Sequence, residues 1–220
     1  TLNAGNSGTL GRLILGLLIH HKKKVRIIGD KSLSKRDFSR VILPLKKFGA
    51  KFKYKSNYKL PIEIKGTSNA RPIIYHEKKG SAQCKSAVML AALNTRGETI
   101  IKAKKSRDHT EILFKHLKIP IKLVKNKKFD LIKIKGQKKF SRLNYNIPSD
   151  ISSSAFFIVL TLLSKKSKLT IKNVNINPSR TGIITILKKM GAKIFFKNKK
   201  KYMGEKVADI LIIGSQKFKS

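Results

Sequence analysis

The sequence predicts a mixed α/β protein built from repeated βαβαββ units. Two sets of helical patterns each occur three times, at intervals of about 70 residues, with short β-type runs between them. Each unit has long, separate helices, so we expect packed units rather than a thin solenoid. A strand is expected before the first helix of every unit.

The first helix of each unit begins with small and hydroxyl-bearing residues and continues as an apolar run. Ser and Asp side chains at these starts provide oxygen atoms that cap the free N–H groups of the first turn. The three patterns cover residues 6–18, 81–93 and 149–163.

The second helix of each unit is amphipathic and is predicted to carry an arginine near its first turn. The three stretches are KRDFSRVILPLKKFGAKF, SRDHTEILFKHLKIPIKL and PSRTGIITILKKMGAKIFF, with Arg36, Arg107 and Arg180 at their starts. The first and third end at Gly-Ala, which is typical of a helix end followed by a strand. The middle stretch has Ile119-Pro120 instead.

Short β-type runs and Gly- and Lys-rich stretches complete each unit. The predicted strands are 24–28, 62–65, 98–103, 131–135, 168–172 and 210–213. Residues 66–79 and 136–147 are predicted to be linkers or turns between units.

The charge is strongly positive, with 51 basic against 11 acidic residues and a formal net charge of +40. Such a charge raises the question of a nucleic-acid partner. Most of the basic residues are lysines spread along the whole chain, so we favour a solvated lysine-rich surface and no nucleic acid. The field still attracts small polyanions.

A single cysteine, Cys84, excludes an internal disulfide framework and fits a reducing compartment. We interpret it as a small core thiol rather than a nucleophile. The longest apolar runs, 13–19 and 155–163, are shorter than the roughly 20 residues that span a bilayer, so no membrane association is expected.

Helix starts with hydroxyls or arginines are suited to binding anions. A helix N-terminus presents free N–H groups and partial positive charge, and arginine adds a planar fork for phosphate or carboxylate. In NSGTLGR, Gly8 allows close backbone approach to a ligand, with Ser7 and Thr9 beside it. The alternative is an ordinary helix cap.

Two further helix starts leave similar alternatives open. In GSAQCKSAVMLAAL, Ser81 and Gln83 are suited to bind a polar ligand or simply cap a solvated helix. In SRDHTE, Arg107 and Asp108 form either a ligand clamp or a cap with a local ion pair. Arg180 is expected to pair with an acid of a neighbouring unit.

Catalytic and metal-binding patterns are missing from the sequence. The five histidines lack metal-ligand spacing, and no close carboxylate pair, Ser-His-Asp pattern or GxxxxGK[ST] motif occurs. We therefore predict binding groups, but no metal site and no catalytic acid or base within these residues.

Six motifs, taken in order, resemble the 5-enolpyruvylshikimate-3-phosphate (EPSP) synthase family. They are NAGNSGTLGRL, GDKSLSKR, GSAQCKSAVMLAAL, SRDHTE, PSDISSSAFF and NPSRTGIITILKKMGA, and they extend over nearly the whole chain. Any one of these motifs is weak, but six in order with compatible spacing are highly specific.

The resemblance implies an inside-out barrel fold of two similar domains, each with three βαβαββ units. About three of the six units are present here. Residues 1–145 would form two units of the first domain, about 1–66 and 67–145, and residues 146–220 one unit of the second. The implied protein is a cytoplasmic enzyme that is monomeric at full length and needs no cofactor.

The resemblance also implies an activity and a set of binding residues. The family transfers the enolpyruvyl group of phosphoenolpyruvate to the 5-hydroxyl of shikimate 3-phosphate, in the pathway to chorismate. Gly8, Arg36 and Gln83 match its phosphoenolpyruvate-binding positions. Ser81, Ala82, Gln83, Ser106 and Arg107 match its positions for shikimate 3-phosphate.

The sequence departs from the family pattern at several positions. Asp37 replaces the proline that usually follows the arginine, and an acid there is expected to weaken the hold of Arg36 on an anion. Ser149 replaces a glycine. The family's Lys-Ser-Arg strip and its proton-transferring Asp and Glu would lie outside residues 1–220, so we expect these residues alone to be inactive.

Three other interpretations stay open. One is the enolpyruvyl transferase that acts on UDP-N-acetylglucosamine, although Cys84 lies on a predicted helix and not in the reactive loop of that enzyme. The second is a lysine-rich nucleic-acid-binding protein. The third is a non-catalytic remnant of the synthase.

Overall fold

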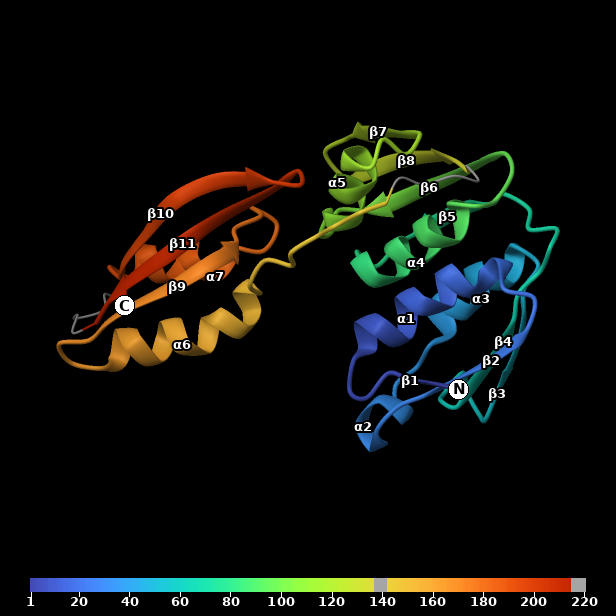
Figure 1. The fold of residues 1–220 in the computed structure, drawn as a ribbon, viewed down its shortest axis with the longest axis horizontal. Helices are drawn as coiled ribbons and strands as arrows, with labels where there is room; N and C mark the ends of the chain where they lie inside the picture. The colour runs from blue at the N-terminus through green and yellow to red at the C-terminus, as the bar shows by residue number, and fades with distance from the viewer. Residues whose placement is uncertain (137–141, 215–220) are drawn as a thin grey trace. The chain divides into compact units, whose positions relative to one another are not determined.

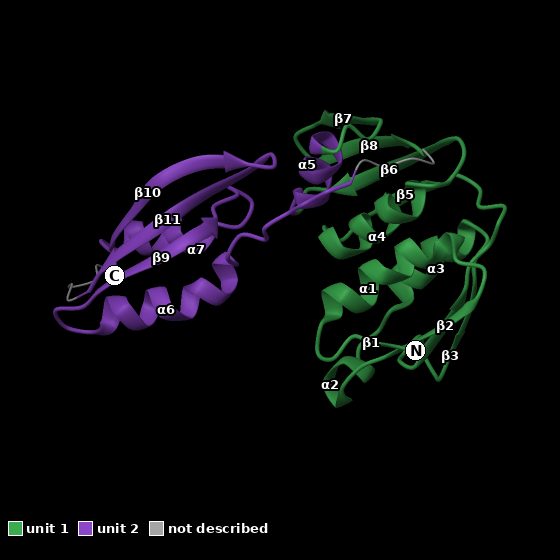
Figure 2. Ribbon diagram, viewed as in Figure 1, with its two compact units in different colours: residues 1–106, 117–141 green, residues 107–116, 142–220 purple. Residues whose placement is uncertain are grey.

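The computed structural model describes residues 1–136 and 142–214, and it divides into two compact units (Figure 2). Residues 1–106 and 117–141 make up the first unit, and residues 107–116 and 142–220 the second. Part of the predicted linker 136–147 lies outside the described residues. Figure 1 labels the helices and strands.

The first sheet of the first unit has four strands in the order β1-β2-β4-β3. β1 and β2 are parallel, and the other pairs are antiparallel. The strands are β1 (Leu2–Asn3), β2 (Lys24–Ile28), β3 (Lys51–Tyr54) and β4 (Ile62–Lys65). The helices are α1 (Gly8–Leu17), the short η1 (Leu18–His20), α2 (Lys31–Ser34) and α3 (Ser39–Lys47).

The second sheet of this unit repeats that topology, in the order β5-β6-β8-β7 with β5 and β6 parallel. Its strands are β5 (Ile74–Glu77), β6 (Glu98–Lys104), β7 (Ile121–Lys125) and β8 (Phe129–Lys135). Helix α4 (Ala82–Ala92) connects β5 to β6. Helix α5 (His109–His116) follows β6 in the chain and belongs to the second unit.

The second unit contains a three-stranded antiparallel sheet in the order β10-β11-β9. Its elements are α6 (Ile151–Leu163), β9 (Lys168–Asn175), α7 (Gly182–Lys189), β10 (Lys193–Tyr202) and β11 (Glu205–Ile213). Before α6, a single parallel bridge joins Ser149 to Val174. This bridge stands where the other two sheets have a short parallel strand, so all three repeats follow the βαβαββ order that the sequence predicts.

The core of the first unit lies between its sheets and the helices α1, α3 and α4. Alternate strand residues such as Ile62, Ile64 and Ile132 are fully or almost fully buried. Helices α1 and α4 run side by side (Figure 1). At their contact, a Cβ on Gly16 would lie 2.2 Å from the carbonyl oxygen of Ala87, so only glycine allows this approach.

The second unit has a core of its own between its sheet and the helices α6 and α7. The buried residues are Ile151, Ile158, Leu162, Val174, Ile184, Ala192, Ile194, Ile210 and Ile212. The first-helix predictions are confirmed, with Ser7, Ser81 and Asp150 as the N-caps of α1, α4 and α6. Cys84 is a buried free thiol, as expected.

The three arginines lie two or three residues before the second helices, close to the starts that the sequence predicts. Arg36 lies between α2 and α3, Arg107 lies before α5, and Arg180 lies before α7. Asp37 explains the first case, because its carboxylate accepts hydrogen bonds from the backbone and the hydroxyl of Ser39, where α3 starts. An arginine inside a first turn would also face the positive end of the helix.

Part of the predicted linker 66–79 is β5, the strand expected before the first helix of the second repeat. β5 pairs with β6 over four residues and carries Glu77 into the interior. The repeat predicted this strand, but its bounds could not be read from the sequence, because Tyr75 and His76 interrupt the apolar run.

Substituting Gly16 by alanine tests the α1–α4 contact. We expect Gly16→Ala to lower the free energy of unfolding of the first unit by about 2 kcal/mol or more, since backbone atoms must move apart. Gly11→Ala in the same helix is the control, because its Cβ would meet Phe38 only at 3.4 Å. Urea denaturation measures both, and equal stabilities for the two variants would contradict the close contact.

Candidate functional site

The parallel strand pairs bring helix starts together at one edge of each sheet of the first unit. The carboxyl ends of parallel strands point to the same edge, where ligands of such sheets commonly bind. In the first sheet, the chain leaves β1 into the start of α1 and leaves β2 toward Arg36. Gly8 and Arg36 therefore become neighbours although 28 positions separate them in the sequence.

Two guanidinium groups lie beside Gly8 at the start of α1. A Cβ on Gly8 would be 2.7 Å from Nη1 of Arg12 and 3.1 Å from Nη1 of Arg36. The hydroxyl of Ser7 accepts the backbone N–H of Leu10 at 3.1 Å and so caps the helix. Free helix N–H groups and two arginines at one place are suited to bind an anion.

Arg12 is held in place by contacts on several sides. Its Nη1 donates to the carbonyl of Gly8 and to Oε1 of Gln83, each at 3.2 Å, and its Nη2 donates to the carbonyl of Asp37 at 3.3 Å. The guanidinium also lies over the ring of Phe38, 4.9 Å from its centre. Burial is the largest cause that lowers the pKa of Arg12, and the positive charge of Arg36 acts in the same direction.

Gln83 connects the start of α4 to this cluster. Its Nε2 donates to the hydroxyl of Thr9 at 2.7 Å, while its Oε1 accepts from Arg12. Ser81 caps α4 by accepting the backbone N–H of Cys84 at 3.3 Å, and Ala82 is the first helical residue. The start of α4 and the start of α1 thus form one polar surface within the first unit.

Arg36 keeps its guanidinium available for a ligand. Among the described residues, none makes a hydrogen bond or ion pair with it. Asp37, expected from the sequence to weaken Arg36, directs both carboxylate oxygens to Ser39, at 2.7 Å each. The Asp37 carboxylate thus makes no described contact with Arg36, and a weaker hold of Arg36 on an anion stays a prediction.

The structure brings three of the predicted residues, Gly8, Arg36 and Gln83, to one place, with Arg12 between them. Ser106 follows β6, at the same edge of the sheet as Ser81. The residues next to these two serines lie close together, since a Cβ on Gly80 would be 3.2 Å from the carbonyl oxygen of Lys105. Arg107 belongs to the second unit, and its part in the site stays a prediction.

Arg12 is a candidate site residue that the sequence motifs did not single out. It lies four positions after Gly8 in α1, which places both residues on the same face of the helix. This spacing of four residues could have predicted that Arg12 lies beside Gly8.

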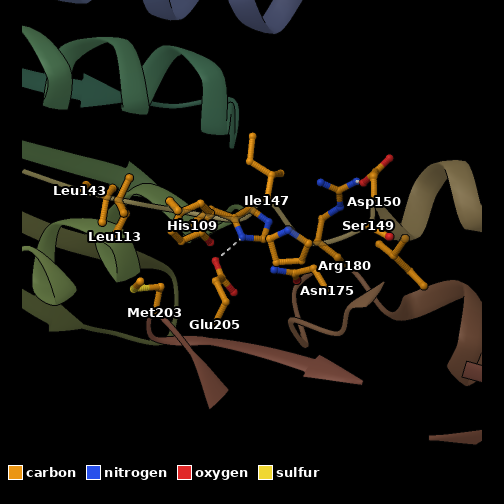
Figure 3. A pocket seen from close by; sticks show the side chains of 13 residues that line it. His109, Leu113, Leu143, Ile147, Ser149, Asp150, Asn175, Arg180, Met203 and Glu205 are labelled. Atoms are coloured by element: carbon orange, nitrogen blue, oxygen red, sulfur yellow. Dashed lines mark hydrogen bonds and ion pairs between the residues drawn. The ribbon is translucent and has the colours of Figure 1, made fainter. Parts of the chain in front are cut away.

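The second unit has a pocket of its own, of about 340 Å³ (Figure 3). Its polar wall contains His109, whose Nδ1 lies 2.6 Å from Oε1 of Glu205, and nearby Asn177 donates to Asp108 at 2.9 Å. At the start of α6, Arg180 pairs with Asp150 at 2.8 Å. The expected pairing of Arg180 with an acid of a neighbouring unit is wrong, because Asp150 lies in its own unit.

Glu205 is buried but ionised. Burial acts to raise its pKa, but the hydrogen bonds from His109, Asn175 and Asn177 outweigh it and hold the pKa of Glu205 below its usual range. The carboxylate therefore joins α5 to β9 and β11 inside the second unit.

The part of the chain that the structure describes contains neither a cluster of metal ligands nor a membrane-spanning helix. Within residues 1–136 and 142–214, no group of three or more His, Cys, Asp or Glu side chains is arranged to hold a metal ion. No described helix combines the length and hydropathy needed to cross a bilayer.

Solved structures define the class of this fold. EPSP synthase from Acinetobacter baumannii matches with a TM-score of 0.80 and 37% identity, over 98% of this chain and 48% of that one. The enolpyruvyl transferase NikO from Streptomyces tendae matches with a TM-score of 0.66 over 92% of this chain and 46% of that one, and its 13% identity shows the fold alone. The fold is that of the enolpyruvyl transferases.

Sequence comparison gives the family. The family model described as EPSP synthase (3-phosphoshikimate 1-carboxyvinyltransferase) matches residues 1–213, and the chain belongs to this family. The 3-phosphoshikimate 1-carboxyvinyltransferase of Petrotoga mobilis is 44% identical over 97% of this chain and 49% of its own length. That of Caldicellulosiruptor bescii is 42% identical over 96% and 49%. The chain thus spans about half the length of these curated relatives.

Substituting Gly8 by alanine tests the anion site. The new Cβ displaces the guanidiniums of Arg12 and Arg36, so we expect Gly8→Ala to weaken binding of inorganic phosphate about tenfold, the effect of one charged hydrogen bond. The control is Gly182→Ala, also at the first position of a helix, where a Cβ would meet nothing within 4 Å. NMR titration measures the affinity, and unchanged binding in a folded Gly8→Ala variant would contradict the site.

Acidification tests the His109–Glu205 pair. Because the folded pKa of Glu205 lies below its ordinary value of 4.5, its charge stabilises the fold above that pH, and the stabilisation is lost as the pH falls through the folded pKa. We expect Glu205→Gln to lower the melting temperature at neutral pH and to flatten its decline on acidification. The half-exposed Glu98, 4.0 Å from Lys133, provides the control Glu98→Gln. Parallel pH curves for wild type and Glu205→Gln would disprove the pairing.

Proposed function

We propose that this chain is part of an EPSP synthase, which transfers the enolpyruvyl group of phosphoenolpyruvate to the 5-hydroxyl of shikimate 3-phosphate. In this reaction a bond forms between that hydroxyl oxygen and C2 of phosphoenolpyruvate, and the bond from C2 to the phosphate oxygen breaks. The observation that carries the proposal is the convergence of Arg12, Arg36 and Gln83 on Gly8. Family membership and the names of the relatives support it.

The residues of this chain would bind and orient the substrates. Arg36 and Arg12 would hold the carboxylate and phosphate of phosphoenolpyruvate, and Gly8 leaves space for them. Ser81, Ala82 and Gln83 would bind shikimate 3-phosphate beside it, with Ser106 and Arg107 on its phosphate. These groups would offset the repulsion between two anionic substrates and fix their orientation, which supplies much of the rate acceleration.

The proposal extends to the organisation of the whole enzyme. We propose that residues 1–145 belong to a first domain and residues 146–220 to a second, in a cytoplasmic enzyme that is monomeric at full length. Among the alternatives, the transferase acting on UDP-N-acetylglucosamine is disfavoured, because these relatives are named for phosphoshikimate as substrate.

Calorimetry with the purified chain tests the proposal. We expect phosphoenolpyruvate to bind, and Arg36→Gln to weaken that binding about tenfold to a hundredfold by removing a charged donor fork. The control is Arg26→Gln, an exposed arginine on β2. Binding that is enhanced by UDP-N-acetylglucosamine and not by shikimate 3-phosphate would overturn the assignment, as would retention on DNA that survives excess shikimate 3-phosphate.

A turnover assay is the companion measurement. Since the chain spans about half the length of its relatives and no general acid or base is predicted in it, we expect no phosphate release above the blank. Clear turnover by these residues would show that we have overlooked the catalytic groups.

A further inference from the structure

A buried carboxylate lies directly before the start of α4. Glu77 is the last residue of β5, and its side chain is only 3% exposed. A charged group is rarely buried unless it is paired and hydrogen-bonded. Neither the sequence motifs nor the proposed substrate contacts account for it.

Glu77 closes the turn between β5 and α4. Its Oε2 accepts the backbone N–H of Ser81 at 2.8 Å, and its Oε1 accepts that of Lys79 at 3.2 Å. Between these two residues, Gly80 has φ of +72°, a conformation that favours glycine. The carboxylate therefore binds the turn on both sides of its tightest point.

Arg40 of α3 supplies the compensating charge. Its Nη2 donates to Oε1 of Glu77 at 3.0 Å, and its side chain is 43% exposed. Without this partner, a negative charge would remain buried close to a site that has to accept an anion. The ion pair joins α3, which follows Arg36, to the turn that precedes Gln83.

We propose that Glu77, neutralised by Arg40, is a positioning residue for the anion site of the first unit. It holds the N–H of Ser81, Ser81 caps α4, and the first turn of α4 presents Gln83 to Thr9 and Arg12. Glu77 itself touches no ligand. The identity of the anion rests on the proposed function, whereas the contacts that position Gln83 do not depend on it.

A carboxylate suits this position better than its amide. Two equivalent oxygen atoms accept from two backbone N–H groups and from a guanidinium at once. Glutamine at position 77 would turn an NH₂ group toward one of these donors, and the turn would lose a hydrogen bond without a change in side-chain size. Glu77→Gln is therefore the conservative probe.

A double-mutant cycle on binding of phosphoenolpyruvate tests the coupling. We expect Glu77→Gln and Arg40→Met each to raise the dissociation constant about fivefold to tenfold, and the double variant to be no weaker than the weaker single variant. If the two effects multiply, Arg40 acts on the anion directly and the proposal fails. Arg26 and Glu63, paired across β2 and β4, supply a matched control cycle that removes the same charges.

Amide hydrogen exchange separates positioning from general loss of stability, and it needs no ligand. In Glu77→Gln we expect faster exchange at Lys79, Ser81 and Cys84, and unchanged exchange at Ile101 in the centre of β6. Uniform acceleration through the unit, or no change at Ser81, would overturn the proposal. If wild type shows these protections but does not bind phosphoenolpyruvate, the proposed function fails and the positioning role stands.

Discussion

The close contact between α1 and α4 is the constraint on which the candidate site depends. Gly16 lies against the carbonyl of Ala87, and any side chain there would force the two helices apart. Because the helices meet along their length, their first turns also meet, and Gln83 reaches Thr9 and Arg12. A packing requirement in the core thus sets the geometry of polar groups at the surface.

The net positive charge around this site depends on which groups the nearby carboxylates contact. Three arginines, Arg12, Arg36 and Arg40, gather in the first unit, and the nearby acids are engaged elsewhere. Asp37 binds the start of α3, and Glu77 binds Arg40 and the turn before α4. Arg36 is left with a guanidinium that no described residue pairs, so the excess positive charge is local and directed. This concentrated positive charge differs from that of the lysines, which are spread over the whole chain.

Local features were predictable from the sequence, and contacts between distant residues were not. The N-caps Ser7, Ser81 and Asp150 follow from composition within one helical turn, and the repeat follows from spacing. The pairs Arg40–Glu77 and His109–Glu205 each join a helix residue to a strand residue far away in the chain, and only tertiary packing brings them together. The exact start of α3, three residues after Arg36, was not predictable, because the side-chain hydrogen bonds of Asp37 decide where that helix begins.

The single bridge between Ser149 and Val174 has a consequence for the second unit. Where the first unit has short parallel strands, here two backbone hydrogen bonds, from Ser149 to Asn173 and from Asn175 to Ser149, attach the beginning of α6 to its sheet. The hydroxyl of Ser149 also donates to the carbonyl of Lys172, and Arg180 pairs with Asp150, whose side chain is 48% exposed, so ions in solution screen this pair. Raising the ionic strength therefore weakens the Arg180–Asp150 pair, while the hydrogen bonds of Ser149 and the buried side chain of Ile151 still hold this end of α6 to its sheet.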